Sequence, residues 1–252
     1  MIYIYYINRM VKYWIMKNIY KIHPLSYVIA LIAFFTGQFR NYILFMIIIF
    51  IHEAGHIITS CFFKWKIKKI IILPFGCLSI FNEKINKPLY QEFIISIMGI
   101  VFQMICLFPF NRYYNYLIII FNLLPIYPLD GSKILNIFLN YISNFKTSYL
   151  YTIYISFIVL IVIFFLVIIY KDLIMFIIFL PLLFNLVKTY KGRKEYINKF
   201  YLERYLYNFN FNKNKIIKNI YDMKKDYNHY FLIKNKLIPE KKYLLRYYNK
   251  VH

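Results

Sequence analysis

The chain has 252 residues, 61% of them hydrophobic, and a mean hydropathy of +0.52. Several apolar runs are long enough to cross about 30 Å of hydrocarbon, which excludes an ordinary soluble protein and indicates a polytopic membrane protein. The net charge of +22 comes from a bias in composition that affects every segment alike, so we expect contact with anionic lipid headgroups and no nucleic-acid binding.

The first 23 residues are rich in tyrosine, and no small-residue cleavage site follows them. They do not fit a signal peptide, so residues 1–23 are expected to form a basic cytoplasmic or interfacial extension. We expect an all-α polytopic protein, in which residues 24–190 form the intramembrane core with about six transmembrane segments. The predicted segments are 25–37, 42–63, 89–110, 114–127, 148–170 and 172–189.

The distribution of Lys and Arg predicts the orientation of these segments. With a cytoplasmic N-terminus and six crossings, the outer loops contain only three of the 32 basic residues, namely Arg40, Arg112 and Lys171. This asymmetry follows the positive-inside rule. Both termini are therefore expected in the cytoplasm.

The second segment contains the sequence His52-Glu53-Ala54-Gly55-His56. Residues four apart share one face of a helix, so the two imidazoles can bind a single metal ion. The Glu53 carboxylate projects about 100° away and can reach a water molecule on that ion. The spacing therefore predicts a catalytic zinc site.

A catalytic zinc ion typically has three protein ligands, and Asp130 is the candidate for the third. A carboxylate at bilayer depth is unfavourable by about 2.5–3.5 kcal/mol, so it is expected to have a partner and a function. Of the ten acidic residues, only Glu53 and Asp130 lie well within or at the deep end of apolar runs. Cys61 is an alternative ligand, but a helix turns it about 140° from His56.

Two β-rich runs flank Pro74-Phe75-Gly76, between the second and third segments. They predict a small β-hairpin or re-entrant loop, whose unpaired edge could hold an extended substrate. An ordinary cytoplasmic loop is the alternative.

The fourth segment contains Asn122, Pro125 and Pro128. Proline breaks a helix and exposes carbonyl groups, which a membrane tolerates where they line protein or a water-filled cavity. A hydrolytic site needs such water. Asn122 could hydrogen-bond the substrate or a developing oxyanion, or it could cap the broken helix.

Two motifs resemble those of the site-2 protease family of intramembrane zinc metalloproteases (peptidase M50), particularly its sporulation branch. They are His52-Glu53-x-x-His56 and Asn122-x-x-Pro125-x-x-Pro128-Leu129-Asp130-Gly131. The resemblance covers roughly residues 25–190 and implies a site-2-protease-like core. It implies that His52, His56 and Asp130 bind Zn²⁺, and that Glu53 is the catalytic acid/base.

The same resemblance implies a biological role. A member of this family would cleave a membrane-associated or membrane-spanning protein in regulated proteolysis, such as the processing of a pro-sigma factor. It would be an integral protein of the bacterial cytoplasmic membrane, and an inhibitory or activating membrane protein would be a further partner.

Two regions depart from the family. Residues 99–103 lack the family's proline and have Gln103 where asparagine is expected, which puts a substrate-gating or packing detail in doubt. The tail, residues 191–252, has 16 basic and 5 acidic side chains and no phosphate-cradling glycine loop, so we expect a small basic interaction module. His23, His229 and His252 are expected to be surface groups.

Two other functions use the same residues. A transmembrane metal-ion transporter should show further polar residues across the other segments, and the sequence has few. A proteolytically inactive membrane scaffold has no need of Glu53. The sequence therefore favours the protease.

Overall fold

The computed structural model describes residues 20–22, 24–73, 76–81, 84–107, 112–171, 173–233 and 236–249. Within these ranges the protein is mostly helical and contains two three-stranded sheets. It groups into two compact units, and helix α4 contributes residues to both. The first unit is Met1–Glu83 with Ile97–Ile119, and the second is Lys84–Ser96 with Ile120–His252.

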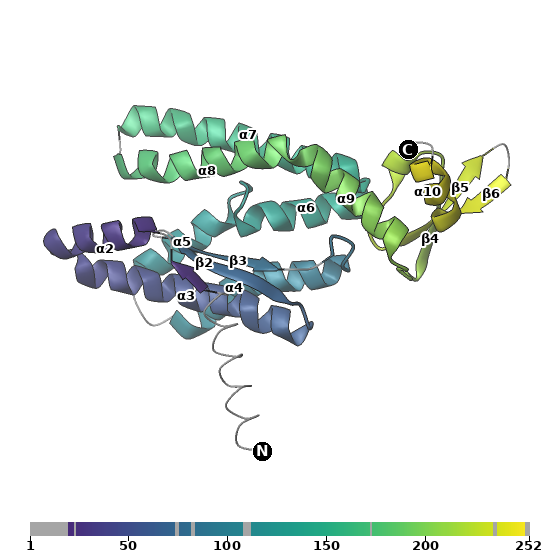
Figure 1. Cartoon of the computed structure of the whole chain (residues 1–252). Coiled ribbons are helices and arrows are strands. Elements are labelled where there is room, and N and C mark those ends of the chain that lie inside the picture. The colour runs from purple at the N-terminus through teal and green to yellow at the C-terminus, as the bar shows by residue number, and fades with distance from the viewer. Residues whose placement is uncertain are drawn as a thin grey trace, which may run out of the picture. The chain divides into compact units, whose positions relative to one another are not determined.

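The first unit contains a small sheet and the helices that carry the first motif (Figure 1). Its elements are β1 (Tyr20–Ile22), α2 (Pro24–Phe35), α3 (Phe39–Phe62), β2 (Ile67–Leu73), β3 (Gly76–Phe81), and parts of α4 (Leu89–Leu107) and α5 (Arg112–Leu123). β2 is the central strand, parallel to β1 and antiparallel to β3. β1 and β3 are therefore the two edges of this sheet.

Close helix packing holds α3 in place. Ile48 and Ile49 of α3 form a buried cluster with Ile118 of α5. A Cβ atom at Gly55 would overlap the carbonyl group of Met98 in α4. The backbones of α3 and α4 therefore approach each other at the level of the first motif.

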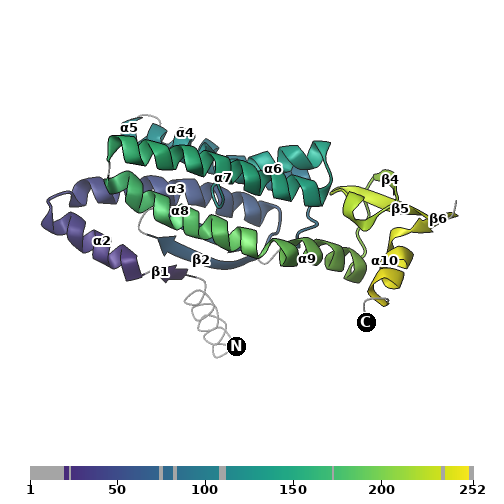
Figure 2. The same ribbon diagram turned by 90° about the horizontal axis from the view of Figure 1, so that it is seen from above.

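The second unit begins with the start of α4 and continues, after the end of α5, with a run of helices. These are α6 (Asp130–Ile142), α7 (Phe145–Tyr170), α8 (Leu173–Lys191) and α9 (Arg193–Leu206). Figures 1 and 2 show α7 and α8 side by side. The small residues Ser148, Thr152 and Ser156 are buried on one face of α7, and each hydroxyl donates to the carbonyl four residues earlier.

Among the described helices, α3 and α7 are long and apolar enough to cross a membrane, and the bent pair α8 and α9 makes a third span if it counts as one. α2 and α5 have 12 residues each. At 1.5 Å per residue each covers about 18 Å, short of the roughly 30 Å of the hydrocarbon core. Two or three spans are thus supported by helix length, and about six remains a prediction.

The tail corrects the expectation of an all-α protein. It contains β4 (Lys213–Ile217), the 3₁₀ turn η1 (Ile220–Asp222), β5 (Tyr227–Ile233), β6 (Lys236–Pro239) and α10 (Glu240–Asn249). β5 is central, parallel to β4 and antiparallel to β6. Its sequence, Tyr-Asn-His-Tyr-Phe-Leu-Ile, is rich in the aromatic and β-branched residues that favour strands.

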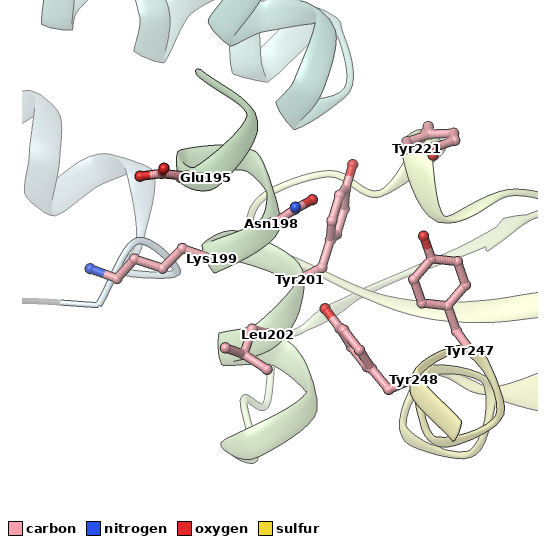
Figure 3. A pocket seen from close by; sticks show the side chains of 8 residues that line it. All are labelled: Glu195, Asn198, Lys199, Tyr201, Leu202, Tyr221, Tyr247 and Tyr248. Atoms are coloured by element: carbon pink, nitrogen blue, oxygen red, sulfur yellow. The ribbon is translucent and has the colours of Figure 1, made fainter. Parts of the chain in front are cut away.

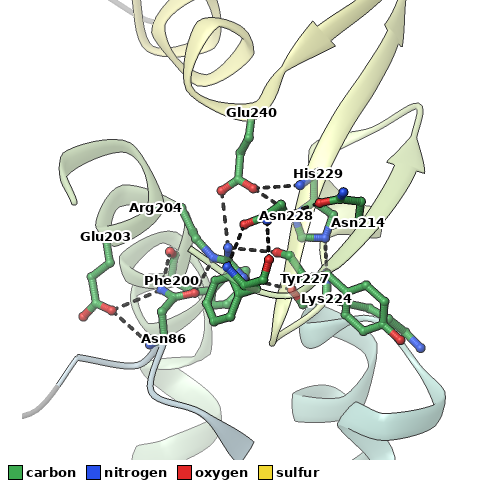
Figure 4. Close-up of polar contacts among 11 residues, drawn as sticks. Asn86, Phe200, Glu203, Arg204, Asn214, Lys224, Tyr227, Asn228, His229 and Glu240 are labelled. Atoms are coloured by element: carbon green, nitrogen blue, oxygen red, sulfur yellow. Dashed lines mark hydrogen bonds and ion pairs between the residues drawn. The ribbon is translucent and has the colours of Figure 1, made fainter. Parts of the chain in front are cut away.

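Arg204 joins α9 to the tail sheet (Figure 4). Its guanidinium donates to the carbonyl oxygens of Tyr227 and Lys224, at 3.0 and 3.1 Å, and to Oδ1 of Asn86 at 2.6 Å. It lies 3.6 Å from the carboxylate of Glu240. The side chain is buried, so this set of acceptors replaces the water that the charge has lost.

His229 is buried in the tail, which corrects the expectation that it is a surface group. Its Nε2 accepts the backbone N–H of Lys224 at 3.0 Å, so the ring proton is on Nδ1, which donates to Glu240 at 3.0 Å. Burial lowers the pKa of His229 below its ordinary 6.5, and the hydrogen bond to Glu240 partly opposes this. His23 and His252 lie outside the described residues.

Candidate metal centre

Helix α3 places His52, Glu53 and His56 in the interior, where each side chain is buried. The Nε2 atoms of the two histidines lie 3.1 Å apart. Two nitrogens bound tetrahedrally to one zinc ion at 2.0–2.1 Å would lie about 3.3 Å apart. The two histidines therefore fit a shared metal ion.

Helix α4 supports these histidines from one side. Nδ1 of His52 lies 2.9 Å from Oε1 of Gln103, and Nε2 of Gln103 donates to Asn115. One turn before Gln103, a Cβ atom at Gly99 would overlap the ring of His56. The imidazoles are thus confined by a hydrogen bond and by close packing.

Asp130 is the first residue of α6, in the second unit, and it is buried. The N-terminus of a helix favours negative charge, which stabilises the ionised carboxylate there. Nζ of Lys133 donates to Oδ1 of Asp130 at 2.7 Å. The carboxylate therefore has an ion-pair partner on its own helix.

Helix α5 ends at Leu123, and the chain is not helical again until Asp130. The Ser156 hydroxyl of α7 lies 2.9 Å from the carbonyl oxygen of Pro125 and can donate its one proton there or to Thr152, so protein provides a partner for this carbonyl. A Cβ atom at Gly131 would overlap the carbonyl of Leu123, so the first turn of α6 packs directly against the end of α5. Asn122 lies in the last turn of α5.

His52, His56 and Asp130 could bind a metal ion, because one ligand atom of each lies within 4.8 Å of those of the other two. Two histidines and one carboxylate are a common ligand set of catalytic zinc sites. In the part of the chain that the structure describes, Cys61 does not belong to this group and is exposed in the last turn of α3.

Sequence reasoning did not assign a role to Gln103, Gly99 or Lys133. Lys133 follows Asp130 by three residues, the spacing of helical ion pairs, so it could have been found once a helix was expected to begin at Asp130. For Gln103 the sequence shows a departure from the pattern of the resembled family and a polar residue in an apolar run, and neither indicates its partner.

A cavity of about 340 Å³ lies in the tail (Figure 3). It is lined by residues of α9, η1 and α10, among them Tyr201, Tyr221, Tyr247 and Tyr248. The Tyr201 hydroxyl is buried without a hydrogen-bond partner. None of the residues predicted for catalysis lines this cavity.

The chain is similar to known proteins in sequence and in fold. The sequence pattern of peptidase family M50 matches residues 41–114. The chain is 30% identical to stage IV sporulation protein FB of Bacillus subtilis (strain 168) over 203 residues, which are 73% of this chain and 70% of that protein. The fold is similar to that of a site-2 protease from Methanocaldococcus jannaschii, with a TM-score of 0.53 and 20% identity over 67% of this chain and 89% of that one.

Proposed function

Since the chain belongs to peptidase family M50 and is an intramembrane metalloprotease, we propose that its metal is Zn²⁺ and that it cleaves a membrane-associated or membrane-spanning protein. His52, His56 and Asp130 would hold the ion. The observation that carries this proposal is the grouping of these three buried side chains within 4.8 Å. When bound, zinc would lower the pKa of a water molecule toward 7 and polarise the scissile carbonyl.

Residues of the chain would transfer the proton, stabilise the oxyanion and bind the substrate. Glu53, buried beside the two histidines in α3, takes the proton from the attacking water and returns it to the leaving nitrogen. Asn122 donates to the developing oxyanion, a contribution of about 2.7–4 kcal/mol for such a donor in a comparable hydrolase. The outer edge of β3 pairs with the extended substrate, which sets the register of the peptide bond.

The biological role follows from the same proposal. The curated relative is named for sporulation, and for this chain we propose regulated proteolysis, such as the processing of a pro-sigma factor. The chain would lie in a bacterial cytoplasmic membrane with both termini in the cytoplasm. An inhibitory or activating membrane protein would control access to the site.

The test is co-expression of the wild type, Glu53→Gln and Glu195→Gln with tagged candidate substrates, including a pro-sigma-type prosequence. Glu195 lies in α9, so its variant makes the same chemical change outside the proposed site. Gel analysis should show cleavage by the wild type and by Glu195→Gln, and none by Glu53→Gln.

Metal analysis of the purified proteins completes this test. About one zinc ion per chain is expected in the wild type and in Glu53→Gln, because Glu53 is not a ligand in this scheme. Asp130→Asn should retain less zinc, since an amide is a weaker ligand than a carboxylate. Cleavage by Glu53→Gln would contradict the role of Glu53, and a wild type without zinc would contradict the metal assignment.

A further inference from the structure

Gln103 is fully buried in α4, between a proposed metal ligand and an asparagine of α5. We infer that Gln103 is a positioning residue that fixes the tautomer of His52, and that Asn115 fixes the orientation of Gln103. The inference rests on the proposed zinc function and adds to it a support that extends from α5 through α4 to α3.

The orientation of the Gln103 amide follows from its neighbours. One end lies 3.0 Å from the backbone carbonyl oxygen of Asn115 and 2.7 Å from the Oδ1 atom of the same residue. A backbone carbonyl can only accept, so this end of the Gln103 amide must be the NH₂ group. The Oε1 atom of Gln103 is therefore the end that faces His52.

The tautomer of His52 follows in turn. Oε1 of Gln103 can only accept, and it lies 2.9 Å from Nδ1 of His52, so Nδ1 carries the ring proton. A neutral imidazole has one such proton, so Nε2 carries a lone pair and can act as a metal ligand. Nε2 is the atom that lies 3.1 Å from Nε2 of His56, where a shared metal ion would bind.

Burial makes this arrangement selective. His52, Gln103 and Asn115 are 4%, 0% and 6% exposed, so bulk water has little access to replace a missing partner. A buried Nδ1–H without an acceptor is unfavourable. Without Gln103, His52 would therefore favour the opposite tautomer, in which the proton occupies the metal-binding nitrogen. Gln103 thus keeps His52 ready to bind the metal.

The length of the side chain also matters. Asparagine, which has the same amide group as Gln103, is one methylene shorter. Gln103 reaches both His52 and Asn115 within hydrogen-bond distance. Asparagine on the same backbone could not span both partners.

The first experiment measures zinc affinity by chelator competition for the wild type, Gln103→Met and Gln103→Glu. Methionine keeps the size of the side chain but has no strong acceptor, so zinc affinity should fall by about 10- to 100-fold, as for other partners of metal-binding histidines. Glutamate retains an acceptor for Nδ1–H and should keep zinc affinity near that of the wild type. Gln91→Met is the matched control in the same helix, since the Gln91 amide donates to the Tyr90 hydroxyl.

Wild-type affinity in Gln103→Met, or equal losses in Gln103→Met and Gln103→Glu, would overturn the inference. Either result leaves the proposed zinc function intact, because that function fails only if the wild type binds no zinc.

A second measurement needs no variant at Gln103. Nitrogen-15 spectra of metal-free protein with labelled histidine report which ring nitrogen is protonated, and His52→Gln assigns the signal. We expect the proton of His52 on Nδ1. A proton on Nε2 would overturn the inference even if Gln103→Met does not fold.

Discussion

Gly99 leaves room for the imidazoles of α3. A Cβ atom there would overlap Nε2 and Cε1 of His56 and come within 2.9 Å of Cε1 of His52. Both rings are buried, so neither can move aside into solvent. The missing side chain at position 99 is therefore part of the proposed metal centre, although glycine provides no ligand.

We expect Gly99→Ala to weaken zinc binding. Overpacking of this kind costs about 1–3 kcal/mol, which corresponds to roughly 5- to 150-fold in affinity when the displaced ring is a ligand. Chelator competition and a cleavage assay measure the effect. Gly192→Ala is the control, because the nearest atom to a Cβ there is at an ordinary 3.5 Å. A Gly99→Ala protein that binds zinc as tightly as the wild type would contradict this account.

The residues of the site differ in how far the sequence could identify them. His52, His56 and Asp130 are predictable because chelation requires particular residue types, and the helical spacing places two of them on one face. Gln103 is not, since its hydrogen bond to His52 joins residues 51 positions apart and depends on how α3 packs against α4. Metal ligands can be recognised by residue type and spacing, whereas the residues that orient these ligands are determined by tertiary packing.

At the scale of elements, a long and continuously apolar helix could be predicted from the sequence, whereas shorter or more polar elements could not. α7 has 26 residues and few polar ones, and the predicted segment 148–170 lies within it. α6 was not predicted as an element, because its apolar residues do not form a continuous run. Lys133, Asn136 and Asn140 instead make a polar stripe on one face of the helix. The tail strands were missed because their lysines and asparagines obscure the strand propensity of their aromatic and β-branched residues.

The packing of α10 against β5 predicts a pH dependence of stability. Because burial lowers the pKa of His229, the folded tail keeps this imidazole neutral where the unfolded chain, with an ordinary pKa of 6.5, takes up a proton. Glu240 opposes this shift, while Arg204 and Lys215 add to it. The free energy of unfolding should therefore decrease as the pH falls below about 6.5, by at most about 1.4 kcal/mol per pH unit until the folded-state pKa is reached.

Thermal unfolding of the full-length protein in detergent, at about pH 7.5 and about pH 5.5, measures this effect. Acidification also protonates other groups of the protein, so the comparison is with His229→Gln. Glutamine can accept from Lys224 and donate to Glu240 but cannot take up a proton. The variant should lose less stability on acidification, and an equal loss in both proteins would rule out His229 as the source.

For the whole molecule, the distribution of basic residues and the lengths of the helices are two separate tests of the membrane topology. When the crossings alternate as six segments would, all but three of the 32 basic residues lie on the predicted cytoplasmic side. Helix length supports only two or three spans among the described residues. The difference concerns α2, α4 and α5, which do not count as spans by length. Of these, α4 and α5 either cross separately or enter and leave on one side.

Cysteine labelling distinguishes these topologies. In a background with the three native cysteines replaced, Gln38→Cys, Arg112→Cys and Lys171→Cys should react with a membrane-impermeant maleimide on intact cells, whereas Lys218→Cys in the tail should react only after permeabilisation. Residues 38 and 171 face the same side with either count, because both counts place an even number of crossings between them. Labelling of residue 112 distinguishes the two topologies. A reaction in intact cells requires α4 and α5 to cross separately, whereas no reaction in intact cells places their junction on the cytoplasmic side. Labelling of residue 218 in intact cells would place the basic tail outside, on the side that the positive-inside rule disfavours.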